Sequence, residues 1–280
     1  GIVLEPTIHR GPAVEHSTNP ESLDRYHKAR EIQRRNLERF LKDPSIAVDL
    51  LAQHESVFSH QDLSKLVHYR SSSVEEFNAL KSAIESCPEL VSLGIGADGK
   101  HYYTSQKVLE RERALLDCAT RLSKSDRHQI KAERFQFVTN HLGLSAEQKE
   151  AFDFILSGQD LSLLVGFAGT GTGYLMNAVR EAYEAEGYRV VGAALAGKAA
   201  DGLAQSAQIN AKTIARFLLD WENERDLLNA KTVLIVDEAG MIGTRQLQCL
   251  LAEAERAACK IILCGDPEQI PSIEAGSPFR

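Results

Sequence analysis

The chain has 280 residues, of which 43% are hydrophobic and 25% charged, the composition of a globular protein with room for two domains. No apolar run approaches the ~18 residues that a membrane span needs. The five scattered cysteines favour a reduced, cytoplasmic protein and give no sign of a disulfide framework or a zinc site. The net charge of −7 lies entirely in residues 144–280, which hold 12 basic and 19 acidic residues, because residues 1–143 hold 20 of each. Overall charge therefore gives no argument for a nucleic-acid partner, which has to be inferred from motifs.

Residues 1–42 are predicted to form a linker followed by an amphipathic helix over 21–42. The polar face of this helix is basic, but acidic residues are interleaved with the basic ones. Such a face could contact phosphates, whereas a solvated helix face is the more common outcome for a mixed charge run. We expect the solvated face.

Residues 43–140 are predicted to form a mainly helical, winged-helix-like accessory domain. Capping patterns begin three helices, near Asp43, Ser59 and Ser73. An Asp98-Gly99 turn then joins two short β-like runs, and a further amphipathic helix covers 105–124. Winged-helix domains often bind DNA, but the second and third helices carry few basic residues, so a DNA-binding domain and a structural spacer both fit. We place the end of this domain near residue 140.

Residues 141–280 are predicted to form an α/β domain with a parallel sheet. Strand-like and helix-like segments alternate strictly from Leu144 onward. The strands are short apolar runs at 161–165, 189–194, 232–236 and 260–264, and the helices lie at 145–156, 174–186, about 198–206 and about 244–257. Apolar runs without alternation are typical of parallel strands buried on both faces, whose ligands bind at the carboxyl ends.

The stretch Leu161–Leu175 has the layout of a phosphate-binding loop, in which a strand leads through a glycine turn into a helix. Gly166 and Gly171 match the pattern G-x-x-x-x-G-K-S/T. We assign the phosphate cradle to Gly166, Gly169 and Gly171, and count Thr170, Thr172 and Gly173 with them as nucleotide-binding positions. Thr172 stands where the pattern has Lys, and Gly173 where it has Ser or Thr. The cradle is therefore present, while the two side chains that contact phosphates and Mg²⁺ are missing.

Polar residues at other strand ends complete a candidate nucleotide site. Asp237 and Glu238 follow a buried strand, where one acid can hold Mg²⁺ and the other can orient the attacking water. Gln269 follows the next strand and could sense the terminal phosphate. Gln148, in LSAEQKEAF, could read an adenine edge, and it also fits a capping box with Ser145.

Three further residues are candidates for contact with a nucleic-acid backbone. Lys198 lies in ALAGKAADGL, and Thr213 and Arg216 lie in TIARFL. ALAGKAADGL follows the predicted strand at 189–194, and TIARFL is expected to follow a strand end for which no range is predicted. The apolar residues around these three are interpreted as core.

The order and spacing of these motifs resemble a known family. GFAGTG, ALAGKAADGL, TIARFL, LIVDEAGMI and GDPEQIPSIEAGSPF resemble motifs I, Ia, Ib, II and III of superfamily 1 DNA helicases, and LSAEQKEAF resembles their Q motif. The resemblance is most specific to the helicase portion of TraA-type conjugative relaxases, which are related to RecD-like helicases. LEPTIHRGPA resembles the segment that follows the relaxase domain. The resemblance implies a RecA-like P-loop domain that uses ATP and Mg²⁺, a parent protein that nicks DNA and unwinds it 5′–3′ in plasmid transfer, and single-stranded DNA and the conjugation machinery as partners.

The chain departs from the family pattern in two ways. Thr172 and Gly173 predict an impaired nucleotide site. The resemblance also implies a relaxase domain before this chain and, after residue 280, a second RecA-like domain with the arginine finger, so we expect the chain alone to be inactive in unwinding. The alternative is a non-catalytic module that binds single-stranded DNA or acts as a scaffold on a vestigial motor fold. The altered residues of the phosphate-binding loop, Thr172 and Gly173, favour this alternative. The polar residues Asp237, Glu238 and Gln269 count against it.

Overall fold

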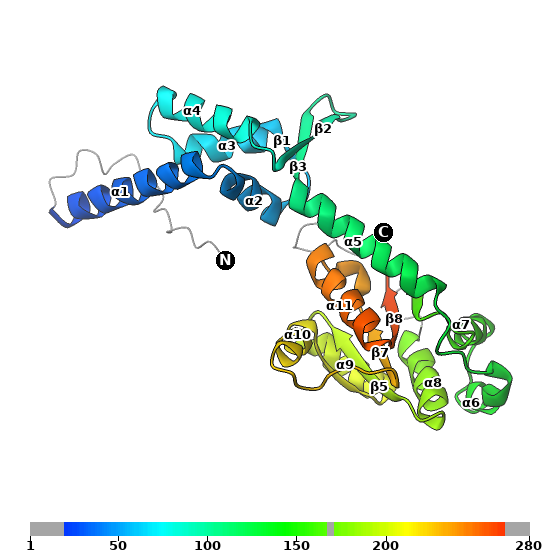
Figure 1. Ribbon diagram of the computed structural model, residues 1–280. Coiled ribbons are helices and arrows are strands. Elements are labelled where there is room, and N and C mark those ends of the chain that lie inside the picture. The colour runs from blue at the N-terminus through cyan, green and yellow to red at the C-terminus, as the bar shows by residue number, and fades with distance from the viewer. Residues whose placement is uncertain (1–19, 167–170, 267–280) are drawn as a thin grey trace. The chain divides into compact units, whose positions relative to one another are not determined.

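The computed structural model describes residues 20–166 and 171–266 (Figure 1). The chain divides into two compact units, residues 1–110 and 111–280. The division falls within α5 (Gln106–Lys124), earlier than the expected boundary near residue 140. The reason is that the second half of α5 and the segment after it contribute core residues to the second unit: Leu115, Cys118, Leu122, Ile130, Phe135 and Val138. No helix in the described ranges has the length and apolar character to cross a membrane.

The first unit combines helices with a small antiparallel sheet. Its elements are α1 (Pro20–Lys42), α2 (Ser45–His54), β1 (Phe58–Ser59), α3 (His60–Arg70), α4 (Val74–Glu85), β2 (Leu90–Ile95) and β3 (His101–Ser105). The strand order is β1-β3-β2. Ser59 begins α3 through a capping box with Asp62, and Ser73 accepts a hydrogen bond from the backbone of Glu76 at the start of α4. The predicted helices and hairpin are confirmed, and β1 is an additional strand.

The second unit is built on a five-stranded sheet in which every pair is parallel. Its strands are β4 (Leu161–Val165), β5 (Arg189–Ala194), β6 (Asn210–Thr213), β7 (Thr232–Val236) and β8 (Lys260–Gly265). The order across the sheet is β4-β8-β7-β5-β6. The four predicted strands are confirmed, whereas β6 and the helix after it were not predicted.

Helices cover both faces of this sheet (Figure 1). One core contains residues of α7 (Ala146–Leu156), α8 (Thr172–Ala185) and α9 (Gly197–Ala207), together with the short η1 (Ala132–Phe135) and α6 (Gln136–His141). The other contains residues of α5, α10 (Ile214–Glu222) and α11 (Thr244–Ala257), and η2 (Ala239–Met241) follows β7. Successive residues of β7 alternate between the two cores, as expected for a central parallel strand.

The expectation that every strand is buried on both faces is wrong for β4. Leu163 and Val165 are 55% and 59% exposed. β4 is the last strand in the order and, within the described part of the chain, pairs with β8 alone. The central strand β7 is buried at all five positions. Apolar composition therefore does not distinguish an edge strand from a central one.

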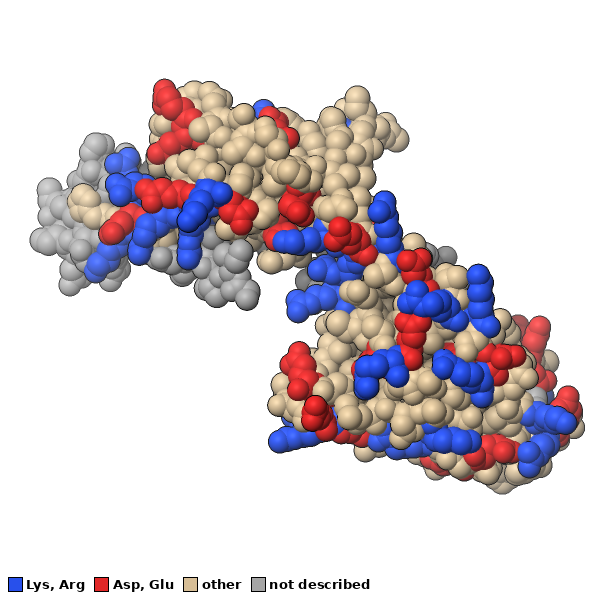
Figure 2. Space-filling model, viewed as in Figure 1, with Lys and Arg blue, Asp and Glu red and all other residues tan. Residues whose placement is uncertain are grey.

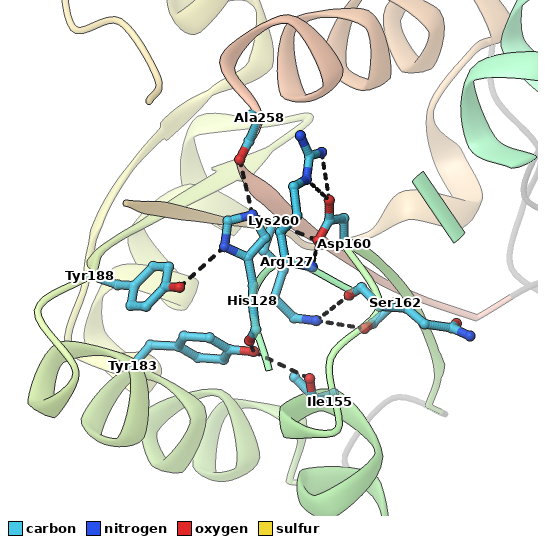
Figure 3. Close-up of polar contacts among 10 residues, drawn as sticks. Arg127, His128, Ile155, Asp160, Ser162, Tyr183, Tyr188, Ala258 and Lys260 are labelled. Carbon is cyan, nitrogen blue, oxygen red and sulfur yellow. Dashed lines mark hydrogen bonds and ion pairs between the residues drawn. The ribbon is translucent and has the colours of Figure 1, made fainter. Parts of the chain in front are cut away.

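A buried polar cluster fastens the segment after α5 to the amino-terminal edge of the sheet (Figure 3). The Asp160 carboxylate, which is fully buried just before β4, accepts hydrogen bonds from the backbone N–H of Arg127 at 3.1 Å and from its Nε at 2.7 Å. The Lys260 ammonium, buried at the start of β8, donates to the carbonyl of Gln159 and to Ser162 Oγ at 3.2 Å.

His128 belongs to the same cluster and lies between two elements. Its Nε2 is 2.9 Å from the carbonyl oxygen of Ala258, and its Nδ1 is 3.3 Å from the hydroxyl of Tyr188. Burial lowers the pKa of His128 below its ordinary value, so the ring is neutral at pH 7. In the tautomer that satisfies both contacts, Nε2–H donates to Ala258 and Nδ1 accepts from Tyr188.

Candidate nucleotide site

The phosphate-binding loop starts and ends in defined positions on the sheet. The N–H of Gly166, directly after β4, donates to the carbonyl of Gly265 at the end of β8, at 3.2 Å. Gly171 precedes α8 with a φ of 79°, a left-handed conformation that favours glycine. Gly169 and Thr170 lie outside the described residues. The predicted cradle therefore starts at the carboxyl end of β4 and ends at the first turn of α8.

Gln148 forms the predicted capping box and also contacts this loop, which was not predicted. Its Nε2 donates to the carbonyl of Gly171 at 3.3 Å, while its Oε1 accepts from the backbone N–H of Ser145 at 3.0 Å. The capping box at the start of α7 is thus formed. One amide side chain begins the helix and joins it to the loop, and the predicted contact with adenine stays a prediction.

Two carboxylates stand at the same edge of the sheet. Asp237 follows β7, and its backbone N–H donates to the carbonyl of Ala193 at 2.9 Å. Its Oδ1 accepts from the N–H of Glu238, also at 2.9 Å, and Glu238 has a φ of 55°. Burial raises the pKa of Asp237, and burial together with the neighbouring Asp237 charge raises that of Glu238. A cation would favour the ionised forms.

The turn after β7 lies directly on the end of β8. A Cβ atom at Gly265 would be 2.7 Å from the backbone nitrogen of Gly240, and one at Gly240 would overlap the carbonyl oxygen of Asp266. Only glycine allows main chain to approach main chain this closely. The turn that carries the two carboxylates therefore contacts the beginning of the turn that leads to Gln269, which lies outside the described residues.

Substituting Gly265→Ala is expected to lower the free energy of unfolding of the second unit by about 1–3 kcal/mol, because the added methyl group overpacks this contact. Denaturant unfolding followed by the fluorescence of Trp221 measures the change, since the chain has one tryptophan and it lies in this unit. Gly197→Ala is the matched control, because a Cβ at Gly197 meets nothing within 4 Å. Equal effects of the two substitutions would contradict the prediction.

The residues that follow the loop do not complete a site for phosphate and Mg²⁺. Thr172 and Gly173, the first two residues of α8, supply neither an ammonium nor, at 173, a hydroxyl group. A Cβ at Gly173 would lie 2.6 Å from Ser206 Oγ and still closer to Ser206 Cβ. Among the described residues, no cluster of three or more His, Cys, Asp or Glu side chains could hold a metal ion. The carboxylate part of the site fits the metal, and the loop part does not.

The three candidates for nucleic-acid contact lie further along the carboxyl edge. Thr213 ends β6 beside Ala194 of β5, and its hydroxyl caps α10 by accepting from the N–H of Arg216 at 3.2 Å. Lys198 is exposed in the first turn of α9. Arg216 forms an ion pair with Asp220, at 3.1 Å between Nε and Oδ1. The structure brings the three to one edge, although Thr213 already has a structural role.

Comparison with known proteins identifies the family. The chain is 36% identical over 297 residues to the probable conjugal transfer protein TraA of Sinorhizobium fredii and 36% identical over 296 residues to the conjugal transfer protein TraA of Agrobacterium fabrum. Each match covers 100% of this chain and 27% of the relative. The chain belongs to the TraA family of conjugal transfer proteins. It spans about a quarter of the length of these relatives.

The second half of this TraA-family chain also matches more widely. A family described as an AAA domain matches residues 143–280. The ATP-dependent RecD2 DNA helicase of Deinococcus radiodurans is 34% identical over 141 residues, which cover 49% of this chain and 19% of that helicase. The parallel sheet and its helices are those of a RecA-like P-loop domain preceded by a mainly helical unit, and the expected resemblance to TraA-type and RecD-like proteins is confirmed.

Sequence reasoning missed three residues that shape the TraA-family site. In the sequence Gly240 and Gly265 are distinguished only as parts of motifs, and Ser206 lies outside every motif. All three matter because of close approach between segments distant in sequence. For Gly240 and Gly265, the glycine content of the turns was the one feature of the sequence that could have indicated the close contact.

Proposed function

We propose that this chain supplies the first, nucleotide-binding RecA-like domain of a cytoplasmic DNA motor in a conjugal transfer protein, with its helical unit as accessory domain. The observation that carries the proposal is the meeting of three motifs at one sheet edge. At this edge lie Gly166, which begins the phosphate-binding loop after β4, the Asp237-Glu238 pair after β7 and the start of the turn after β8. Gln148 contacts Gly171 at the other end of the loop. This is the arrangement that binds nucleotide at the carboxyl ends of parallel strands.

Each motif has a proposed role in the parent protein. The backbone of Gly166, Gly169, Thr170 and Gly171 would cradle the phosphates of ATP, and Gln148 would face adenine. Asp237 would hold Mg²⁺, Glu238 would orient water, and Gln269 would contact the γ-phosphate. Because Thr172 and Gly173 lack the usual side chains, we propose that this chain binds nucleotide weakly and does not hydrolyse it alone.

Single-stranded DNA is the proposed track, running past Lys198, Thr213 and Arg216 at the far end of the same edge. Local groups rather than overall charge would have to attract it, since the net charge is −7. Figure 2 shows lysine and arginine side chains interspersed with acids along α1, and Arg34 pairs with Glu38 there. This pattern supports a solvated face for α1. We therefore propose no DNA contact for the accessory domain.

A second candidate function is a non-catalytic module that binds single-stranded DNA or acts as a scaffold in the conjugation machinery. The close approach of Ser206 to Gly173 favours it, because the fold leaves no space for the usual hydroxyl side chain. The Asp237-Glu238 pair, with its raised pKa values, counts against it, since two half-buried acids without a cation are unfavourable.

Thr172→Lys is expected to raise the affinity for ATP about tenfold or more, measured by isothermal titration calorimetry with Mg²⁺ present. A hydrogen bond to a charged group contributes about 1.5–3 kcal/mol, and about 1.4 kcal/mol corresponds to a factor of ten in affinity. The substitution places an ammonium group at the start of α8, where the pattern of the phosphate-binding loop has one.

Thr120→Lys is the matched control, since it adds the same charge at an exposed position of α5. The proposal predicts no change in ATP affinity for this variant. If Thr172→Lys leaves affinity unchanged, or if the control raises it equally, the loop is not a nucleotide site and the scaffold function is favoured.

A further inference from the structure

We infer that Ser206 of α9 determines whether the phosphate-binding loop can carry a metal-binding hydroxyl, because Ser206 and any side chain at position 173 exclude each other. The inference rests on the proposed nucleotide site. It goes beyond that site in assigning a positioning role to a residue outside every helicase motif. It also makes the departure at Gly173 a consequence of how α8 and α9 pack.

The contact is between the first turn of α8 and the last turn of α9. A Cβ atom built on Gly173 would lie 2.6 Å from Ser206 Oγ, 3.6 Å from its Cα, and closest to its Cβ. Rotation about χ1 would move the Ser206 hydroxyl away, but the Cβ atom is fixed by the backbone. A serine or threonine at position 173 therefore requires the two helices to separate.

Hydrogen bonding and packing at the end of α9 oppose its separation from α8. Arg180 of α8 donates through Nε to the carbonyl of Ala207 at 3.1 Å and to Asn177 Oδ1 at 3.2 Å. Leu203 and Ala207 are buried in the core that α8 and α9 share. The residues before and after Ser206 are thus anchored by a hydrogen bond and by packing, so that Ser206 stays against α8.

The consequence concerns which substitutions can restore the loop. Thr172→Lys adds charge at a position that already carries a side chain, whereas Gly173→Ser introduces the hydroxyl into occupied space. Restoring the loop pattern at both positions would therefore still leave a strained α8. We expect Ser206→Gly to be the substitution that makes a hydroxyl at 173 compatible with the fold.

A double-mutant cycle on the complete chain tests the inference by thermal unfolding, followed by Trp221 fluorescence. Gly173→Ser is expected to lower the melting temperature by roughly 5 °C, as overpacking of a core contact does. Ser206→Gly alone is expected to lower it by a few degrees, because glycine weakens a helix. With both substitutions, the melting temperature is expected to be no lower than that of Gly173→Ser. If the double variant loses the sum of the two single decreases in melting temperature, the inference is overturned.

Gly197→Ser is the control for the cycle, because it adds the same side chain to the first turn of α9 in open space. Its effect is expected to add to that of Ser206→Gly, and a coupling as large as that of Gly173→Ser would overturn the inference.

A second measurement is the affinity for ATP, with and without Mg²⁺, in chains that carry Thr172→Lys. Gly173→Ser is expected to make ATP affinity depend on Mg²⁺ several-fold more strongly only when Ser206→Gly is also present. An equal gain with Ser206 in place would overturn the inference. Failure of Thr172→Lys to bind ATP would instead contradict the proposed function, and the unfolding cycle would still decide the role of Ser206.

Discussion

Asp160→Ala is expected to lower the free energy of unfolding of the second unit by about 3 kcal/mol. Removing one partner of a buried ionic cluster typically costs about 3–5 kcal/mol, because it leaves the other charges without compensation. Here Lys260 is fully buried and loses its neighbouring anion, while Arg127 is half exposed and can turn to water. The lower end of the range therefore applies. Urea unfolding followed by Trp221 fluorescence measures the loss.

Asp153→Ala is the control for this prediction, since Asp153 is exposed on α7. Its expected effect is within about 0.5 kcal/mol of zero, as for most surface substitutions. A loss of similar size in both variants would show that the buried cluster does not stabilise the unit.

Lys260→Met is expected to change how stability depends on pH. Burial lowers the pKa of Lys260 to about 8, from an unfolded value near ~10.4. Between these values the unfolded chain binds a proton that the folded chain does not, so the lysine's contribution to stability rises with pH. Relative to Lys260→Met, the unmodified chain is expected to gain about 2 kcal/mol of unfolding free energy between about pH 7 and about pH 9.5.

The comparison between the two proteins removes the effects of other groups that titrate in this range. Burial also raises the pKa of Cys259 to about 12 and raises those of Tyr183 and Cys264. These groups oppose the lysine, because they weaken the fold as pH increases. They are present in both proteins, so their contributions cancel in the difference. A difference that stays constant with pH would contradict a depressed pKa for Lys260.

Local sequence patterns were sufficient to predict most elements of the second unit. The runs at 161–165, 189–194 and 232–236 coincide with β4, β5 and β7, because buried parallel strands are continuous apolar runs bounded by turn residues. β6 was missed because Asn210–Thr213 is short and three of its four residues are polar. It is a strand only because β5 pairs with it.

Tertiary packing determined what the sequence could not show. Leu163 and Val165 have the same apolar character as the residues of β7, yet they are exposed, because strand order depends on crossovers between distant segments. The second half of α5 was assigned to the accessory domain, although its apolar stripe packs in the core of the α/β unit. The contact between Gly173 and Ser206 joins positions that no local pattern relates.

The main-chain contact between Gly240 and Gly265 has a mechanical consequence. Side chains can absorb a displacement by changing rotamer, but two backbones in direct contact have no such freedom. Any shift of the turn after β7 must therefore displace the first residues of the turn after β8. This coupling does not depend on charge. Neither salt nor a change of pH would therefore allow the turn after β7 to move independently of the turn after β8.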